Sequence, residues 1–141
     1  MFNSRFPFYH QLEMVDCGPS CLRMIAKYYG RRYSLEYLRE VCHISRSGVS
    51  LLGIKKGAEK IGLTTAAVKT TYEQLVANAP LPCILHWRQE HFVVLVKVER
   101  KKNGEDRLLI ADPGFGMIYL SKEKFLESWT NTEEGIALLI D

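Results

Sequence analysis

The apolar run that begins at Phe92 constrains the fold more than any other stretch of the chain. It reads Phe-Val-Val-Leu-Val, follows directly on His91 and continues into Lys97 and Val98. A nearly continuous run of β-branched and other apolar residues is typical of a strand buried on both faces. The sequence therefore predicts a sheet in which this strand is enclosed from both sides.

Helical patterns dominate the first part of the chain and strand patterns the second. We expect helices at residues 17–29, 34–41 (with Ser34 as the cap), 51–61, 72–78 and 121–129. We expect strands at residues 63–70, 82–87, 91–100, 107–111, 117–120 and 135–140. Asn103-Gly104 predicts a hairpin turn between the third and fourth strands. A helical half packed on an antiparallel sheet is an α+β fold.

Cys17 lies where a loop is expected to turn into the first helix. Asp16 is a suitable N-cap, and Pro19 fits a first helical turn because the early N–H groups lack partners. The positive end of a helix dipole favours the thiolate, which is the nucleophilic form of cysteine. Cys17 is therefore a candidate nucleophile that needs a base from elsewhere in the chain.

Two later segments could complete a site with this thiol. His91 opens the buried strand, and Asp112 lies in the turn Ala-Asp-Pro-Gly-Phe-Gly that follows the strand at 107–111. A Cys, a His and an Asp on three separate elements fit a catalytic triad that folding brings together. Their order in the sequence does not by itself show that they meet.

The chain carries two motif blocks. The first consists of Gln11, Asp16-Cys17, Cys21-Leu22, Met24 and Tyr29-Gly30, and the second of His91-Phe92, Val94, Asp112-Pro113 and Gly116. Together they resemble the peptidase C39 domain of bacterial peptidase-containing ABC transporters, papain-like proteases that process and export bacteriocins and related peptides. The resemblance extends from Gln11 to the last strand. It implies a papain-like cysteine protease fold, with an N-terminal helical half packed on a C-terminal antiparallel sheet.

The resemblance also implies a role for each polar residue of the site. His91 would form a thiolate–imidazolium pair with Cys17 and later protonate the leaving amine. Asp112 would accept from the other ring nitrogen and orient the imidazole. Gln11, with the backbone N–H of Cys17, would form the oxyanion hole. We expect no metal and no cofactor.

The other Cys and His residues are interpreted as structural. Cys21 should pack inward one helical turn after Cys17, while Cys42 and Cys83 fall in a helix end and a strand. The four Cys include no C-x-x-C pair and fit no zinc-finger or zinc-ribbon spacing. His86 is the competitor for the base, and we interpret it as a loop residue that follows a strand.

The substrate follows from the resemblance alone. It implies precursor peptides whose leader ends in Gly-Gly, Gly-Ala or Gly-Ser, with cleavage after that motif in a narrow cleft. An amphipathic leader helix would lay its apolar face on a shallow hydrophobic surface. Met14 and Val15, beside the nucleophile, either line the cleft or belong to the core. Trp87 and Tyr72 are weaker candidates for substrate contact.

Composition and charge indicate the number of domains and the cellular compartment of the chain. With 141 residues, 47% of them hydrophobic, the chain can form one compact domain, 1–141. No apolar run approaches the roughly 18 residues of a membrane span, and residues 1–9 lack a signal-peptide pattern. Four unevenly spaced Cys suggest a reducing compartment, and a net charge of +3 is too small to indicate nucleic acid. We expect the cytoplasmic face of the bacterial inner or plasma membrane, without membrane insertion.

Three functional classes remain open: a leader peptidase, a catalytically silent substrate-docking module, and a papain-like acyltransferase. The presence of Gln11, Cys17, His91 and Asp112 favours the peptidase. The chain has no P-loop motif. We interpret it as the N-terminal domain excised from a transporter whose transmembrane and ATP-binding domains are its partners, with a free-standing protease as the alternative.

Overall fold

The structure is a computed structural model that describes residues 5–88, 90–130 and 133–141. Its helices are η1 (a short 3-10 turn, Met14–Asp16), α1 (Cys17–Tyr28), α2 (Leu35–Val41), α3 (Leu51–Lys60), α4 (Tyr72–Asn78) and α5 (Lys122–Trp129). Its strands are β1 (Thr65–Thr71), β2 (Cys83–Trp87), β3 (His91–Arg100), β4 (Asp106–Asp112), β5 (Gly116–Ser121) and β6 (Glu134–Ile140). The predicted order of helices and strands is confirmed. The first four residues of the segment assessed for a signal peptide lie outside the description.

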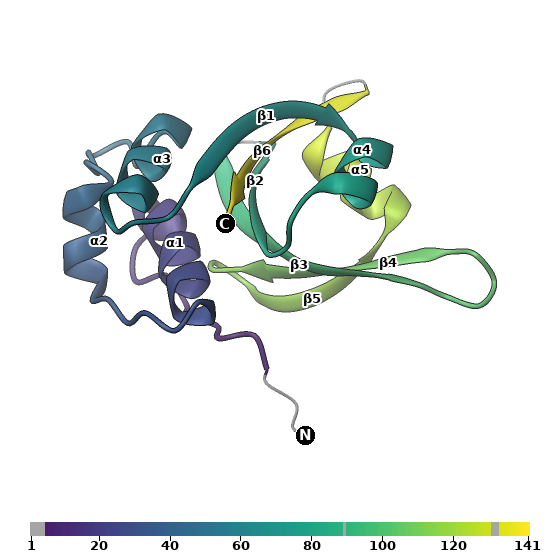
Figure 1. Ribbon diagram of the computed structural model, residues 1–141, viewed down its shortest axis with the longest axis horizontal. Coiled ribbons are helices and arrows are strands. Elements are labelled where there is room, and N and C mark those ends of the chain that lie inside the picture. The colour runs from purple at the N-terminus through teal and green to yellow at the C-terminus, as the bar shows by residue number, and fades with distance from the viewer. Residues whose placement is uncertain (1–4, 89, 131–132) are drawn as a thin grey trace.

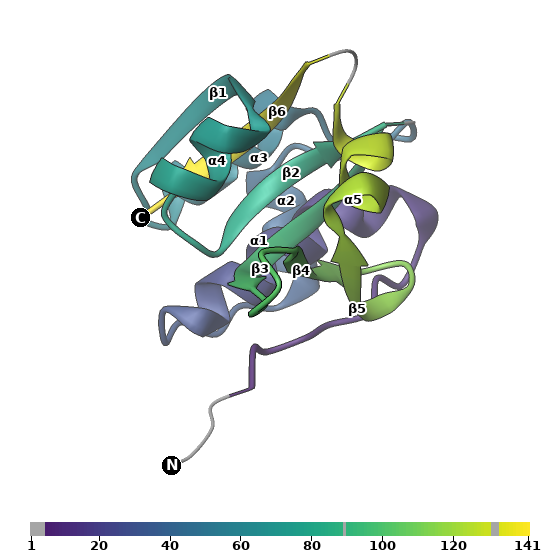
Figure 2. The same ribbon diagram turned by 90° about the vertical axis from the view of Figure 1, so that its right-hand side faces the viewer.

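All strands join one antiparallel sheet in the order β1-β6-β2-β3-β4-β5. The sheet is strongly curved; α1, α2 and α3 gather on one side of it, and α4 and α5 on the other (Figures 1 and 2). The predicted hairpin joins β3 to β4, and Gly104 adopts a φ of 88° in its turn, a conformation that glycine takes at no steric cost. This is the predicted α+β arrangement.

Two hydrophobic clusters hold the layers together, one on each face of the sheet. The first joins α1, α2 and α3 to the sheet through Leu22, Met24, Ile25, Leu38, Ile54, Ile84 and Leu138, among others. The second joins α4 and α5 to the opposite face through Tyr72, Leu75, Leu85, Leu108, Ile110, Phe125 and Trp129. Burial of this apolar surface is the main force that fixes the helical half against the sheet.

The apolar run at the start of β3 divides its side chains between the two clusters. Phe92 and Val94 face the α1–α3 cluster, while Val93 and Leu95 face the α4–α5 cluster. All four side chains are buried. The prediction of a strand enclosed on both faces is confirmed. Because the start of this strand is buried beneath α1, its first residue, His91, lies close to the N-terminus of that helix.

The helices are set by short local signals. Ser34, Ser50, Thr71 and Ser121 each cap the helix that follows by accepting a backbone N–H with the side-chain oxygen. The longest of these helices falls far short of the apolar length needed to cross a bilayer, and this holds for every helix in the described residues.

Candidate active site

Cys17 is the first residue of α1 and opens onto a cleft of about 810 Å³. Only 7% of its surface is exposed. The cleft lies between the helical half and the sheet. Its lining comes from Met14 and Val15 before α1, from the connection at residues 43–51, and from the strand ends around His86 and His91. Of the two positions that the sequence left open for Met14 and Val15, cleft wall or core, both residues occupy the cleft wall. Met14 is 90% exposed.

His91 and Asp112 form a close pair at the same cleft. His91 Nε2 lies 2.6 Å from Asp112 Oδ1, which also accepts from the Gly114 N–H at 2.9 Å. The carboxylate, with a second contribution from the neighbouring Cys17 side chain and against the effect of burial, raises the pKa of His91 to about 9. Since Nε2 is engaged by Asp112, Nδ1 is the ring nitrogen left for the thiol. The imidazole can therefore carry a proton at neutral pH.

Gln11 lies against the turn that carries Asp112. Its backbone N–H donates to the Pro113 carbonyl at 2.9 Å, and its Nε2 donates to the Glu13 carbonyl at 3.0 Å. Among the described residues, Gln11 Oε1 is buried without a hydrogen-bond partner. A Cβ at Gly114 would lie 3.3 Å from this oxygen, so the glycine leaves room for the carboxamide. One Nε2 hydrogen remains available to a ligand.

Asp16 does not act as the N-cap that the sequence predicted. It occupies the position before α1, but within the described part of the chain its side chain makes no capping hydrogen bond to that helix. The carboxylate is fully buried and binds the guanidinium of Arg39 instead. This contact, together with the backbone N–H of Glu13, keeps the pKa of Asp16 below its usual range against the effect of burial.

The interpretation of His86 as a loop residue is wrong. His86 lies in β2, pairs with Phe92 of β3 and stacks on the Phe92 ring at 4.6 Å. Burial lowers the pKa of its imidazole, which favours the neutral ring. It lines the cleft beside His91. The strand alternation could have placed it there, because Ile84 and His86 share a face of β2 and Ile84 packs toward the α1–α3 side.

The remaining thiols are buried away from solvent. Cys21, Cys42 and Cys83 are 0% exposed, so the prediction that Cys21 packs inward is confirmed. Burial raises the pKa of Cys42 to about 12 and that of Cys83 to about 12, and it raises the pKa of Cys21 strongly. In the stretches that the structure describes, no three His, Cys, Asp or Glu side chains gather as metal ligands would.

Neither of the two weaker sequence candidates lines the cleft. Tyr72 is buried in the α4–α5 cluster, and its hydroxyl donates to Asp106. Trp87 packs against the same cluster and lines a smaller groove with Trp129.

The fold defines the class, which is that of papain-like cysteine peptidases. The sequence profile of the peptidase C39 family matches residues 5–140, and the chain belongs to this family. It is 39% identical over 134 residues to the colicin V secretion/processing ATP-binding protein of Escherichia coli. It is 35% identical over 128 residues to the lactococcin-G-processing and transport ATP-binding protein of Lactococcus lactis.

These alignments cover 95% and 86% of this chain but only 18% and 17% of the two relatives. Solved structures agree in fold. A double glycine motif protease from an AMS/PCAT transporter, in complex with its leader peptide, superposes with a TM-score of 0.86 at 33% identity, covering 96% of this chain and 91% of that one. The peptidase domain of Streptococcus ComA gives 0.83 at 30% identity, covering 96% and 98%.

Proposed function

We propose that this domain is a cysteine endopeptidase that removes the leader of ribosomal precursor peptides after a double-glycine-type motif, in step with their export. One observation carries the proposal: the Cys17 thiol opens on the same cleft as His91, whose ring is held by Asp112 at 2.6 Å. Membership of the peptidase C39 family supports it. All four polar residues of the site are present, which favours catalysis over docking alone.

The mechanism uses each residue at a definite atom. The Cys17 thiolate attacks the carbonyl carbon of the scissile bond, and His91 gives its Nδ1 proton to the leaving amine. Asp112 holds Nε2 and stabilises the imidazolium. Gln11 Nε2 and the Cys17 backbone N–H donate to the oxyanion of the tetrahedral intermediate. Water, deprotonated by His91, then releases the acyl group from the sulfur.

The preference for glycine fits the walls beside the thiol. Met14 and Val15 border one side of the cleft beside Cys17. A peptide without bulky side chains before the scissile bond needs the least space there. Met14 and Val15 are therefore proposed to contact the residues just before the cut.

A second groove would receive the leader helix. It has a volume of about 880 Å³ and lies between the segment at residues 5–8, the end of α1 and the strands β3, β4 and β5. Its lining includes the apolar residues Phe6, Phe8, Tyr28, Leu109 and Met117 and the cationic residues Arg5, Lys27 and Lys97. Tyr28 and Met117 are partly exposed, which is what the apolar face of an amphipathic helix would cover.

The chain spans about a fifth of the relatives named above, which are ATP-binding transport proteins. We propose transmembrane and ATP-binding domains of one transporter as its partners. In that setting the domain would act at the cytoplasmic face of the membrane, without inserting into it.

The test is mass spectrometry of the purified domain incubated with a precursor peptide that carries a double-glycine leader, beside the Cys17→Ala variant. We expect a single cut after the Gly-Gly pair with the wild type only. Leader binding by calorimetry should survive in Cys17→Ala. Binding without cleavage by the wild type would make the docking module the better description, and cleavage by Cys17→Ala would exclude Cys17 as the nucleophile.

A further inference from the structure

A bidentate ion pair lies directly behind the nucleophile. Asp16 Oδ1 accepts from Arg39 Nε at 2.8 Å, and Oδ2 accepts from Arg39 Nη2 at 2.6 Å. Oδ2 also accepts from the backbone N–H of Glu13 at 3.0 Å. The Asp16 side chain is 0% exposed and the Arg39 side chain 29%. A single carboxylate thus ties α2 to the segment that leads into α1.

This pair keeps the carboxylate away from the N-terminus of α1. An aspartate just before a helix normally accepts N–H groups of the first turn. Here the guanidinium holds the Asp16 side chain elsewhere and neutralises it. An unpaired anion beside Cys17 would repel both the thiolate and the oxyanion that forms during attack. Arg39 therefore leaves the donors at the start of α1 to the substrate.

The same pair also fixes Glu13, the residue whose carbonyl holds the Gln11 side chain. The Glu13 N–H is bound by Asp16, and the Glu13 carbonyl accepts from Gln11 Nε2 at 3.0 Å. Hydrogen bonds therefore link the guanidinium to Asp16 and Asp16 to the Glu13 N–H, and the Glu13 carbonyl, connected to that N–H through the backbone, holds the carboxamide. An oxyanion donor stabilises the transition state only when it is already in place.

We propose that Arg39 is a positioning residue for the oxyanion site, acting through Asp16 and Glu13 on Gln11. The inference rests on the proposed function, since it assigns Gln11 the oxyanion role. Arg39 itself touches no reacting atom.

Helix α2 holds Arg39 in a fixed position. Leu35, Leu38 and Val41 bury one face of α2, and Ser34 caps its start through the Tyr37 N–H. Arg39 therefore projects from a fixed helix. Its planar fork matches both carboxylate oxygens at once, which the single ammonium group of a lysine cannot do.

The main experiment is a double-mutant cycle of Arg39→Ala and Gln11→Ala, with kcat and KM measured on the double-glycine leader peptide. Gln11→Ala should lower kcat by about 10²–10³-fold. Arg39→Ala should lower kcat by about 10- to 10²-fold, with KM changed by less than about twofold. In the Gln11→Ala background, Arg39→Ala should lower kcat by a clearly smaller factor than in the wild type, because only the repulsion between the unpaired Asp16 carboxylate and the reacting groups remains. If the kcat losses of the two single variants multiply in the double variant, or if Arg39→Ala acts mainly by raising KM, the proposal is overturned.

Arg100→Ala is the matched control, because Arg100 forms the same two-atom contact with Asp106, far from the cleft. It should leave kcat unchanged. If Arg39→Ala does not fold, Arg39→Lys keeps the charge but loses the fork, and an intermediate loss of kcat is expected. Guanidinium ion at millimolar concentration should partly restore Arg39→Ala but not Gln11→Ala. Equal effects on both variants would contradict the proposed path.

A readout without turnover separates this inference from the proposed function. The side-chain amide of Gln11 can be followed by nitrogen–proton NMR, with its resonance assigned by its loss in Gln11→Ala. It should shift in Arg39→Ala and in Arg39→Lys and stay in place in Arg100→Ala. If the wild type cuts no leader, the proposed function fails, yet this shift still tests the path. An unmoved Gln11 resonance in both Arg39 variants would refute it.

Discussion

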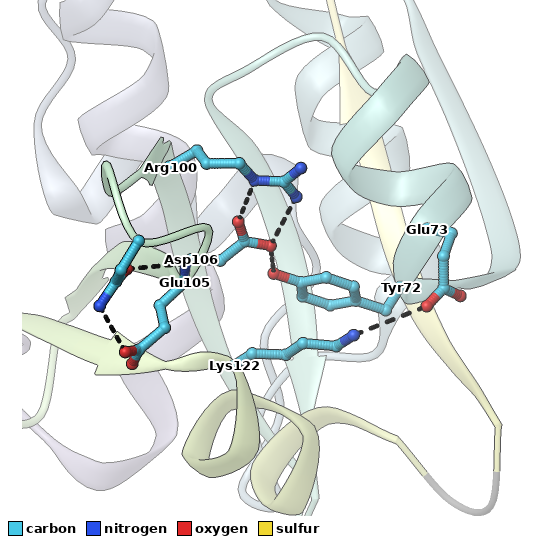
Figure 3. Close-up of polar contacts among 7 residues, drawn as sticks. Tyr72, Glu73, Arg100, Glu105, Asp106 and Lys122 are labelled. Atoms are coloured by element: carbon cyan, nitrogen blue, oxygen red, sulfur yellow. Dashed lines mark hydrogen bonds and ion pairs between the residues drawn. The ribbon is translucent and has the colours of Figure 1, made fainter.

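The two ends of the β3–β4 strand pair carry similar contacts in different settings. Where β3 begins and β4 ends, His91 Nε2 lies 2.6 Å from Asp112 Oδ1. Where β3 ends and β4 begins, Arg100 Nε lies 2.7 Å from Asp106 Oδ1. The first pair opens on the cleft with Cys17. The second lies beside α4, where the Tyr72 hydroxyl donates to Asp106 and Lys122 approaches the Tyr72 ring (Figure 3).

The cation decides what each pair can do. A guanidinium stays charged at every pH at which the protein folds, so the Arg100–Asp106 pair is a fixed link. An imidazole can exchange its proton near neutral pH. Because Asp112 raises the pKa of His91 to about 9, the ring holds a proton that it can pass to a leaving group. The same two strands can thus support chemistry at one end and stability at the other.

The largest effect should come from removing the imidazole. His91→Ala should lower kcat/KM for the leader peptide by about 10²–10⁴-fold, the range that general acid–base catalysis supplies. His86→Ala is the matched control, since His86 lines the same cleft but stacks on Phe92. It should retain most of the activity. If His86→Ala proves the more damaging variant, the base has been assigned to the wrong histidine.

A smaller effect, visible mainly in the pH dependence, should follow from Asp112→Asn. Asparagine keeps a hydrogen-bonding group but loses the charge that favours the imidazolium. The alkaline limb of the kcat/KM profile, expected near pH 9 in the wild type, should move towards 6.5. This limb belongs to the coupled Cys17–His91 pair rather than to one residue. An alkaline limb that stays in place would contradict the role given to Asp112.

The same substitution has a stability signature with a defined sign. Because the pKa of His91 is raised in the folded state, the pair contributes stability that is fully present below 6.5 and is lost as pH rises through about 9. Urea unfolding should therefore show Asp112→Asn destabilised at pH 6, with a smaller difference at pH 10. An equal difference at both pH values would mean that proton linkage to His91 is not its source.

Local patterns were sufficient to predict the elements; the meeting of His91 with Asp112, which the order of the residues did not show, follows once the register of the hairpin is known. The apolar run after His91 marks a buried strand, and Asn103-Gly104 marks the hairpin that turns β4 back along it. An antiparallel hairpin brings the start of one strand to the end of the other. The contact between His91 and Asp112 follows from that register.

The Asp16–Arg39 contact could not be predicted in this way. Asp16 precedes a helix, and its local signal is that of an N-cap. The side chain that binds the Asp16 carboxylate, Arg39, comes from a different helix, α2. The packing of α1 on α2 is set by the shared core rather than by any local pattern. His86 falls inside the strand predicted at residues 82–87, and its pairing with Phe92 bears out that strand rather than the interpretation of His86 as a loop residue.

The smallest effect on activity should come from the far end of the strand pair. Tyr72→Phe removes the hydroxyl that donates to Asp106 Oδ2 at 2.6 Å, while Arg100 still holds the carboxylate. Loss of a hydrogen bond to a charged acceptor should lower the free energy of unfolding by about 1.5–3 kcal/mol, measured by urea titration at pH 7. The kcat/KM value should stay within about twofold, because β3 and β4 are held between the two ends by their own ladder and by both cores. A fall in kcat that exceeds the loss of folded protein would show that the two ends are coupled through the strands.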